Sequence, residues 1–268
     1  MPHPYRTLTS PHNETLKHLA RLVQSARDRR KDDVIVLEGI HLLEAALEQG
    51  VAPAQCFVNE AALARPEVLR LLARLPQTLS PLVVPETLLG KLTSLSSAPE
   101  LIAVCQRPHP PRHSGSCLLL EDIQDPGNMG TILRSAAASG VMEVYLSKGC
   151  ADVFSPKVLR AGMGAHFVLN LHEAADLAEV LSGFAGRKLV THLEGSQSLY
   201  AQDLSGEVAF VFGNEGAGVS EALLGLADCR VRIPMPGHAE SLNVAMAATI
   251  CLFERVRQLD VLPLTDAG

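Results

Sequence analysis

The chain has 268 residues, of which 47% are hydrophobic and 19% charged, and its formal net charge is −6. This apolar content excludes a mainly disordered chain, and no run of residues approaches the roughly 20 apolar residues that span a bilayer. The six cysteines are scattered and form no CxxC pair, which disfavours a disulfide framework and a structural zinc site. We therefore expect a soluble, cytoplasmic protein with no metal site, secretory signal or membrane anchor.

Charge is unevenly distributed along the chain. Residues 1–112 contain 13 Lys/Arg and 11 Asp/Glu, a net charge of +2, whereas residues 113–268 contain 10 and 18, a net charge of −8. Within the first part, residues 6–31 contain seven basic and two acidic side chains, a net charge of +5. This local excess is a candidate phosphate-facing patch, although a solvated helix face would produce the same cluster.

A proline-rich stretch divides the chain. Three prolines and a glycine lie among polar residues in the segment 106–116. Proline removes a backbone donor and disfavours helix at the residue before it, so this segment is typical of a linker. We predict a first domain over residues 1–105, a linker over 106–116 and a second domain over 117–268, both domains being of ordinary size.

The first domain alternates helical and extended patterns. Apolar residues at helical spacing after a possible cap at Asn13 predict a helix, and short apolar runs predict buried strands. The expected elements are a helix over 13–30, a strand over 34–37, a helix over 41–48, a strand over 54–58 and a helix over 63–75. This alternation predicts a small α/β domain with a mainly parallel sheet.

The second domain shows the same alternation more clearly. The expected strands cover residues 118–120, 141–146, 188–192, 208–212 and 229–233. The expected helices cover residues 132–139, 176–181, 220–226 and 241–259. Nearly continuous apolar strands joined by helices predict a parallel sheet covered on both faces. Ligands of such sheets collect in loops at the carboxyl ends of the strands, and three of these loops are rich in Gly, Asn and Glu.

The first of these loops follows the strand over 118–120. Pro126 and Gly127 predict a turn, and Asn128 is placed to cap the next helix. Arg134 lies inside that helix, from which it can reach back to an anionic group, and its planar donors suit phosphate. A capped helix with an ordinary surface arginine fits the same residues.

The second loop joins the strand over 208–212 to the helix that starts at Ser220. It is rich in glycine and polar side chains: Gly213, Asn214, Glu215, Gly216 and Gly218. Such a turn brings backbone amides against a nucleotide or cofactor. Its glycine spacing differs from the dinucleotide fingerprint and it lacks the lysine of a P-loop, so a simple NAD or ATP site is poorly supported. A tight structural turn is the alternative.

The third loop follows the strand over 229–233. Residues 233–237, with two prolines and Met235, suit the wall of a pocket for adenine or another flat apolar group. Ser241, Leu242 and Asn243 then begin a helix whose first turn exposes unpaired backbone N–H groups. The apolar helix that follows, over 244–253, is typical of a core or a subunit interface.

Together, the three loops resemble the signature motifs of the SpoU (TrmH-like) branch of the SPOUT RNA methyltransferases. Residues 128–134 match the N-x-G-x-x-x-R motif, residues 212–220 match the second motif and residues 233–245 match the third. The first domain, with VIVLEGIHLLEAAL at 34–47, resembles the ribosomal-protein-L30e-like substrate-binding domain that many members carry. The resemblance covers nearly the whole chain.

The resemblance implies methylation of a ribose 2′-hydroxyl in structured RNA, with S-adenosylmethionine as the methyl donor. It implies an α/β catalytic domain with a deep C-terminal trefoil knot, and a homodimer whose active site draws on both subunits. By motif match, the expected cofactor contacts are Leu193, Gly213, Asn214, Gly218, Ile233, Met235 and Leu242. Arg134 is the expected catalytic residue, and the residues expected to arrange it and the ribose are Asn128, Glu215, Ser241 and Asn243.

Arg134 poses a chemical difficulty as a base, because a guanidinium is almost never deprotonated in proteins. We expect it first to grip the adjacent phosphate and orient the hydroxyl. Because the second domain is acidic, the basic segment must supply much of the RNA contact, and its candidate residues are Arg27, Arg29 and Arg30.

Ribosomal RNA of the 23S type is the expected substrate, since the L30e-like domain is typical of members that act on it. Transfer RNA is the alternative within the same chemistry. A non-catalytic RNA-binding or assembly factor is the alternative from another class, although Asn128, Arg134, Glu215 and Asn243 are all present. A nucleotide-binding metabolic enzyme would need a phosphate-gripping lysine or a ribose-reading acidic residue, and neither is evident.

Overall fold

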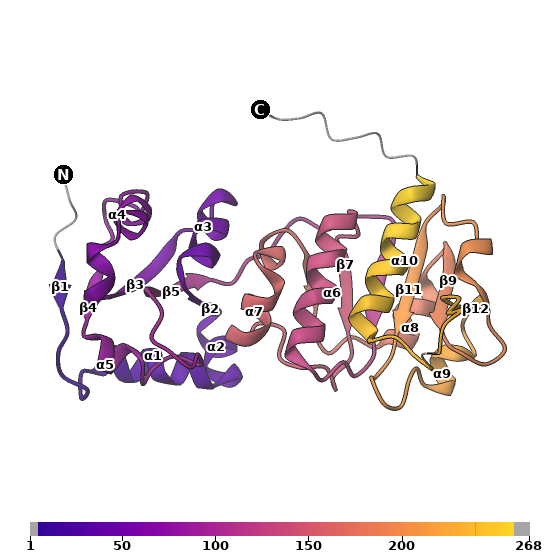
Figure 1. Cartoon of the computed structure of the whole chain (residues 1–268), viewed down its shortest axis with the longest axis horizontal. Coiled ribbons are helices and arrows are strands. Elements are labelled where there is room, and N and C mark those ends of the chain that lie inside the picture. The colour runs from indigo at the N-terminus through magenta and orange to yellow at the C-terminus, as the bar shows by residue number, and fades with distance from the viewer. Residues whose placement is uncertain (1–4, 239, 260–268) are drawn as a thin grey trace. The chain divides into compact units, whose positions relative to one another are not determined.

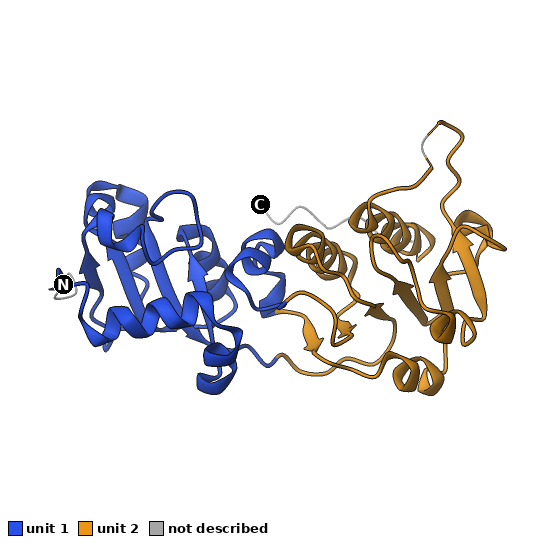
Figure 2. Ribbon diagram, turned by 90° about the horizontal axis from the view of Figure 1, so that it is seen from below, with its two compact units in different colours: residues 1–109, 152–167 blue, residues 110–151, 168–268 orange. Residues whose placement is uncertain are grey.

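The computed structural model describes residues 5–238 and 240–259. The chain forms two compact units, shown by element in Figure 1 and by unit in Figure 2. Unit 1 comprises residues 1–109 and 152–167, and unit 2 comprises residues 110–151 and 168–268. Over the described ranges, no helix has the length and apolarity that crossing a membrane requires.

Unit 1 is built on a five-stranded sheet with the order β1-β4-β3-β5-β2. The strands are β1 (Arg6–Thr7), β2 (Val34–Glu38), β3 (Pro53–Asn59), β4 (Leu82–Val84) and β5 (Leu101–Gln106). β4 runs parallel to β1 and β3, but β5 runs antiparallel to both of its neighbours, β2 and β3. The prediction of a mainly parallel sheet is therefore wrong for this unit. The difference is due to β5, which the sequence pattern did not identify. This apolar strand lies immediately before the proline-rich segment.

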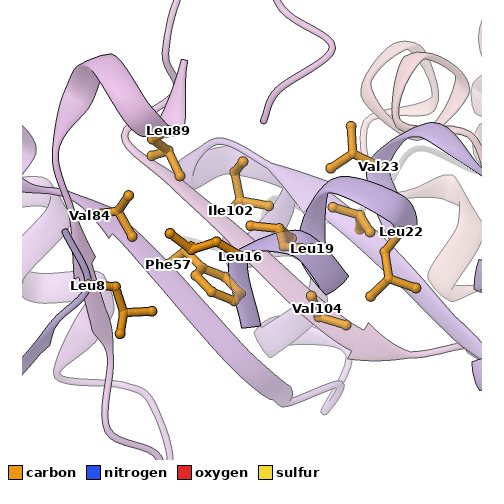
Figure 3. Packing of buried hydrophobic residues seen from close by; sticks show 11 residues of the cluster. Leu8, Leu16, Leu19, Leu22, Val23, Phe57, Val84, Leu89, Ile102 and Val104 are labelled. Carbon is orange, nitrogen blue, oxygen red and sulfur yellow. The ribbon is translucent and has the colours of Figure 1, made fainter. Parts of the chain in front are cut away.

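The helices of unit 1 are short. They are α1 (Glu14–Gln24), α2 (Ala26–Asp32), α3 (Ile40–Glu48), α4 (Pro66–Leu72) and α5 (Glu86–Leu89), with a 3-10 turn η1 (Glu60–Ala64). The single helix expected over 13–30 is two helices, because Ser25 is extended and its hydroxyl accepts from the Asp28 N–H to cap α2. Leu16 and Leu19 of α1 point onto the sheet beside Phe57 and Ile102 in Figure 3. This apolar face fixes α1 against the sheet.

A segment from the middle of the chain completes unit 1. Residues 152–167 form α7 (Pro156–Gly162) and the 3-10 turn η2 (Ala165–Phe167), and α7 packs on β2. Val158 and Leu159 are buried, as is His166. The expected domain over residues 117–268 therefore differs from the compact units, because this segment buries its apolar side chains in unit 1.

Unit 2 contains a seven-stranded sheet with the order β10-β12-β9-β11-β6-β7-β8. Its strands are β6 (Cys117–Leu120), β7 (Glu143–Leu146), β8 (Asn170–His172), β9 (Arg187–Thr191), β10 (Gln197–Ser198), β11 (Val208–Phe212) and β12 (Cys229–Arg232). All six strand pairs are parallel. The parallel α/β sheet predicted for the second domain is confirmed, and the trefoil knot stays a prediction.

Helices cover both faces of this sheet (Figure 1). They are α6 (Pro126–Ser139), α8 (Leu177–Gly183), α9 (Glu221–Leu224) and α10 (Val244–Gln258), with a 3-10 turn η3 (Leu199–Ala201). α6 and α10 pack together and share a 2.7 Å hydrogen bond between the Ser135 and Thr249 hydroxyls. α8 and α9 pack leucines against Leu119 and Val211 on one face of the sheet. The neighbouring residues along β6 and β11 point to the other face, because successive side chains of a strand alternate between faces. The central strands β6 and β11 are therefore buried on both faces.

Candidate active site

The carboxyl ends of β9, β11 and β12 and the start of α10 enclose a cavity of ≈ 340 Å³. Its volume lies in the range of small-molecule sites, and its position is that of ligand sites in parallel sheets. It is lined by all seven residues expected to contact a cofactor: Leu193, Gly213, Asn214, Gly218, Ile233, Met235 and Leu242. Three residues of the expected catalytic group line it as well: Glu215, Ser241 and Asn243.

The glycine-rich turn after β11 requires two of its glycines. A side-chain carbon on Gly213 would lie 2.2 Å from the Gly218 carbonyl, so only glycine lets the two backbones approach. Gly218 has a φ of +72°, a conformation that L side chains rarely adopt. The Asn214 carboxamide oxygen accepts from the N–H groups of Gly216 (2.9 Å) and Ala217 (3.0 Å). These contacts hold the turn open beside the cavity.

Asp125, and not Asn128, caps helix α6. The Asp125 carboxylate accepts from the Asn128 N–H at 2.7 Å, and the helix begins at Pro126. The sequence pattern predicts Asn128 as the cap and a helix that begins at residue 132. The helix starts earlier because proline fits its first position and the aspartate before it satisfies a free N–H. The Asn128 side chain is thereby left to face other loops.

Asn128 joins the second and third loops. Its Nδ2 donates to Glu215 Oε1 at 3.0 Å, and its Oδ1 accepts from Asn243 Nδ2 at 2.9 Å. Asn128 does not line the cavity, but it connects two residues that do. Side chains from all three sequence motifs therefore form one hydrogen-bonded chain.

Glu215 is ionised more readily than an ordinary glutamate. Partial burial opposes ionisation, but the hydrogen bond from Asn128 and the backbone N–H groups of Asp125 and Gln124 outweigh it and lower the pKa of Glu215. A carboxylate that accepts only from neutral donors keeps its negative charge in the site. Glu215 is therefore an anion that fixes the orientation of the Asn128 amide.

Helix α10 begins later than expected. The Asn243 side chain accepts from the N–H groups of Ala245 (2.9 Å) and Met246 (3.3 Å) and caps the helix at Val244, not at residue 241. Ser241 and Leu242 remain in the loop and line the cavity. Leu242 is 38% exposed and Leu193 is 56% exposed, so the described part of the chain leaves two leucines at this cavity only partly covered.

Arg134, the expected catalytic residue, does not line this cavity. It lies on α6, two turns after Asn128, and its side chain is exposed. Among residues 5–238 and 240–259, none forms a hydrogen bond or ion pair with its guanidinium. Arg134 is therefore available to a group outside the described chain.

Arg29 is a correction to the expected RNA-binding set. It is 4% exposed, and its guanidinium donates to the carbonyls of Leu22 (2.6 Å) and Val23 (3.0 Å) and to the Asp152 carboxylate. A buried guanidinium that caps the end of α1 is not available to a phosphate. Arg27 and Arg30, on the same short helix, are exposed.

The sequence interpretation missed a charged residue of the cavity. Arg232, the last residue of β12, lines the cavity and donates to Ser196 in the loop after β9. The only signal was its place directly before the third motif, and a single exposed arginine in a strand carries little information by itself.

The cavity has the chemistry of a site for a nucleoside-like ligand. Exposed leucines and Met235 supply apolar contact, and the tight turn at Gly213 allows close approach to backbone groups. Within the described chain, no cluster of three or more His, Cys, Asp or Glu side chains is arranged to hold a metal ion. The arrangement suits binding of an organic cofactor next to an ordered polar network.

Comparison with known families agrees with this geometry. Residues 115–253 match the model of the SpoU rRNA Methylase family, and residues 13–103 match the MRM3-like substrate binding domain. The chain belongs to the SpoU rRNA methylase family. The resemblance drawn from the three motifs is confirmed.

Two relatives of this SpoU protein align with nearly all of it. A Synechocystis protein named as an uncharacterized tRNA/rRNA methyltransferase is 36% identical and covers 94% of each chain. The Bacillus subtilis 23S rRNA (guanosine(2553)-2′-O)-methyltransferase is 30% identical and covers 92% of this chain and 98% of its own.

Solved structures show the same fold. The crystal structure of an RNA 2′-O ribose methyltransferase matches with a TM-score of 0.81 at 32% identity, covering 94% of this chain and 98% of that one. An AdoMet-bound rRNA methyltransferase from Sinorhizobium meliloti matches with a TM-score of 0.81 at 29% identity, covering 95% and 98%. The two-domain SpoU architecture therefore extends across the chain.

Proposed function

We propose that this SpoU protein methylates the 2′-hydroxyl of a ribose in ribosomal RNA, with S-adenosylmethionine as the methyl donor. The observation that carries the proposal is the meeting of all three motifs at one cavity through Glu215, Asn128 and Asn243. Relatives named as 23S rRNA 2′-O-methyltransferases support the reaction and the substrate class.

The residues of the cavity fit the proposed cofactor. Leu193, Leu242 and Met235 would contact its apolar parts, and the backbone around Gly213 and Gly218 would bind its polar edge. When bound, S-adenosylmethionine supplies an activated sulfonium methyl group. The protein must then place the ribose oxygen in line with that group and help remove its proton.

The polar network gives each residue a task in this alignment. Glu215 orients Asn128, which with Asn243 holds the first and third motifs at a fixed separation. Arg134 would grip the phosphate next to the target ribose and orient the hydroxyl, since its fork of donors suits phosphate. We assign proton removal to no side chain of this network, because a guanidinium does not act as a base at neutral pH.

A homodimer would complete this site. Arg134 is exposed and outside the cavity, so it would serve a cavity other than the one its own chain encloses. On α10, Met246 and Phe253 are 47% and 43% exposed and lie seven residues apart, which places both on one helix face. An apolar helix face of this kind fits burial against a second copy. A cytoplasmic location stays a prediction.

Transfer of labelled methyl from S-adenosylmethionine to unmodified total RNA, separated by size, tests the proposal. We expect label in large ribosomal RNA with the wild-type protein and its loss with Arg134→Ala. Label confined to the tRNA fraction would keep the reaction and change the substrate. Failure of the wild-type protein to bind S-adenosylmethionine, measured by calorimetry, would overturn the proposed function.

A further inference from the structure

The loop between β9 and β10 takes an unusual course at the cavity. This connection has only five residues, His192–Ser196, and we call it the 192–196 strap. It joins two strands that are not neighbours, because β12 lies between them in the sheet. Thr191 and Gln197, the residues before and after it, both pair with Val231 of β12. The strap therefore leaves the sheet and returns to it beside the same residue of β12. Because β12 lies between its two ends, the strap must pass over the residues that follow Val231.

The strap is held in shape by its own hydrogen bonds. The Ser196 hydroxyl donates to the Leu193 carbonyl at 2.7 Å, and the Glu194 N–H donates to His192 Nδ1 at 3.1 Å. Gly195 has a φ of +62°, a conformation that L side chains rarely adopt, within this five-residue connection. These contacts present Leu193 at the cavity with 56% of its surface exposed.

One side chain fastens the strap to the strand beneath it. Arg232, the next residue of β12 after Val231, donates through Nη1 to the Ser196 carbonyl, and its Nη1 lies 3.4 Å from the Ser196 hydroxyl oxygen. Ser196 in turn bonds to Leu193, so a single serine connects the guanidinium to the backbone of the exposed leucine. Hydrogen bonds from charged donors are among the stronger ones.

We propose that Arg232 is a positioning residue for cofactor binding, which acts by fastening the 192–196 strap so that Leu193 closes on the bound S-adenosylmethionine. This inference rests on the proposed function and adds to it a residue whose side chain acts through the strap. Without the hydrogen bonds from Arg232, the strap samples more conformations in the free protein. Binding of the cofactor must then order the strap, and this ordering lowers the affinity. The effect falls on cofactor retention and not on RNA binding or on the aligned hydroxyl.

The direct test is cofactor binding by the full-length Arg232→Met protein, which keeps the length of the side chain and removes its donors. We expect the Kd for S-adenosylmethionine to rise about tenfold, mainly through faster dissociation, because a charged hydrogen bond is lost. The KM for S-adenosylmethionine rises with it, while the KM for RNA and the kcat at saturating cofactor stay within about twofold of wild type. Arg232→Lys, which retains one cationic donor, restores part of the affinity.

Arg230→Met is the matched control. Arg230 lies on the same strand and the same side as Arg232 and does not line the cavity, and its guanidinium has no hydrogen bond or ion pair to any residue in the described ranges. We expect its Kd for S-adenosylmethionine to equal that of wild type. Hydrogen exchange supplies the second measurement: the cofactor should protect amides 192–196 in the wild-type and Arg230→Met proteins and protect them less in Arg232→Met.

The outcomes separate the inference from the function on which it rests. If the wild-type protein does not bind S-adenosylmethionine, the proposed function fails. If the wild-type protein binds it and Arg232→Met binds equally well, only the role of Arg232 is refuted. An equal loss of affinity in Arg230→Met and Arg232→Met would also refute that role, because it would show a general weakening of β12. An unchanged unfolding midpoint for Arg232→Met verifies that the protein is folded in each comparison.

Discussion

Asn128 and Glu215, 87 residues apart in the sequence, are joined by a 3.0 Å hydrogen bond from the amide to the carboxylate. The bond connects the helix that follows β6 with the turn that follows β11, two neighbouring parallel strands. Asn128 also accepts from Asn243, so its amide can take only one orientation. The separation of the motifs at the cavity thus depends on one neutral side chain held by one anion.

Replacing this amide by an acid should make activity depend on pH in a defined direction. Asn128→Asp sets two carboxylates against each other, and their repulsion raises the pKa of the pair. We expect methyl transfer to fall more than about tenfold at neutral pH and to recover partly as the pH is lowered, when one shared proton restores the hydrogen bond. Asn128→Ala, measured over the same pH range, should lose activity without that recovery. Parallel pH profiles for the two variants would contradict the assignment.

The glycine turn at the cavity predicts a sharp difference between two similar substitutions. Gly213→Ala brings a methyl group to 2.2 Å from the Gly218 carbonyl, so the turn must open. Gly216→Ala meets only the Asn214 side-chain oxygen, at 3.5 Å, which is ordinary contact. We expect Gly213→Ala to weaken S-adenosylmethionine binding by at least about tenfold and Gly216→Ala by less than about threefold. Calorimetry on both proteins decides the matter, and equal affinities would be evidence against a cofactor at this turn.

Arg134 should not tolerate replacement by lysine. Lysine keeps the positive charge but lacks the planar fork that we assign to phosphate and hydroxyl orientation. We expect Arg134→Lys to reduce kcat by about a hundredfold or more while the Kd for S-adenosylmethionine is unchanged, because we assign Arg134 to the RNA phosphate and the ribose hydroxyl and not to the cofactor. Near-full turnover by Arg134→Lys would remove this residue from the mechanism.

Arg29 and Arg27, two residues apart on α2, should respond to substitution in opposite ways. Arg29→Met breaks a buried pair with Asp152, and the free energy of unfolding should fall by roughly 3 kcal/mol, the low end for such pairs because the Asp152 side chain is 23% exposed. Arg27→Met should leave the free energy of unfolding unchanged and reduce the salt dependence of RNA binding. Urea unfolding and RNA binding at several salt concentrations distinguish the two roles. Unchanged salt dependence in Arg27→Met would argue against RNA contact by α2.

The repeating apolar patterns and the motif spacings made much of this architecture predictable. The central strands β6 and β11 were predictable because a strand buried on both faces is apolar throughout, whereas the sequence pattern did not indicate the short strands β8 and β10. The cavity residues were predictable because the carboxyl ends of parallel strands meet at one edge of the sheet. Gly213 and Leu242, although distant in sequence, both line the cavity for this reason.

Other features depend on tertiary contacts that no local pattern records. Arg29 belongs to a run of basic residues that looks uniformly exposed, and only its pairing with Asp152, 123 residues away, shows that it is buried. Asp125 and Asn128 are both good capping residues, and only the folded structure shows that Asp125 caps the helix while the Asn128 side chain donates to Glu215, 87 residues away. The segment 152–167 lies between strands of unit 2 in the sequence but belongs to unit 1, where α7 packs on β2.

His166, in that segment, should make stability depend on pH. Its ring is buried, with Nε2 2.8 Å from the Val153 carbonyl, and burial lowers its pKa to about 4 from the ordinary histidine value of 6.5. As the pH falls, the unfolded chain therefore protonates this histidine at a higher pH than the folded protein does. The histidine has no effect on the free energy of unfolding above pH 6.5 and lowers it by about 3 kcal/mol as the pH falls to about 4. His166→Gln can still donate to Val153 but does not titrate. In urea unfolding at pH 7 and pH 4.5, the variant should lose less stability than wild type, whereas equal losses would show that the proton is taken up elsewhere.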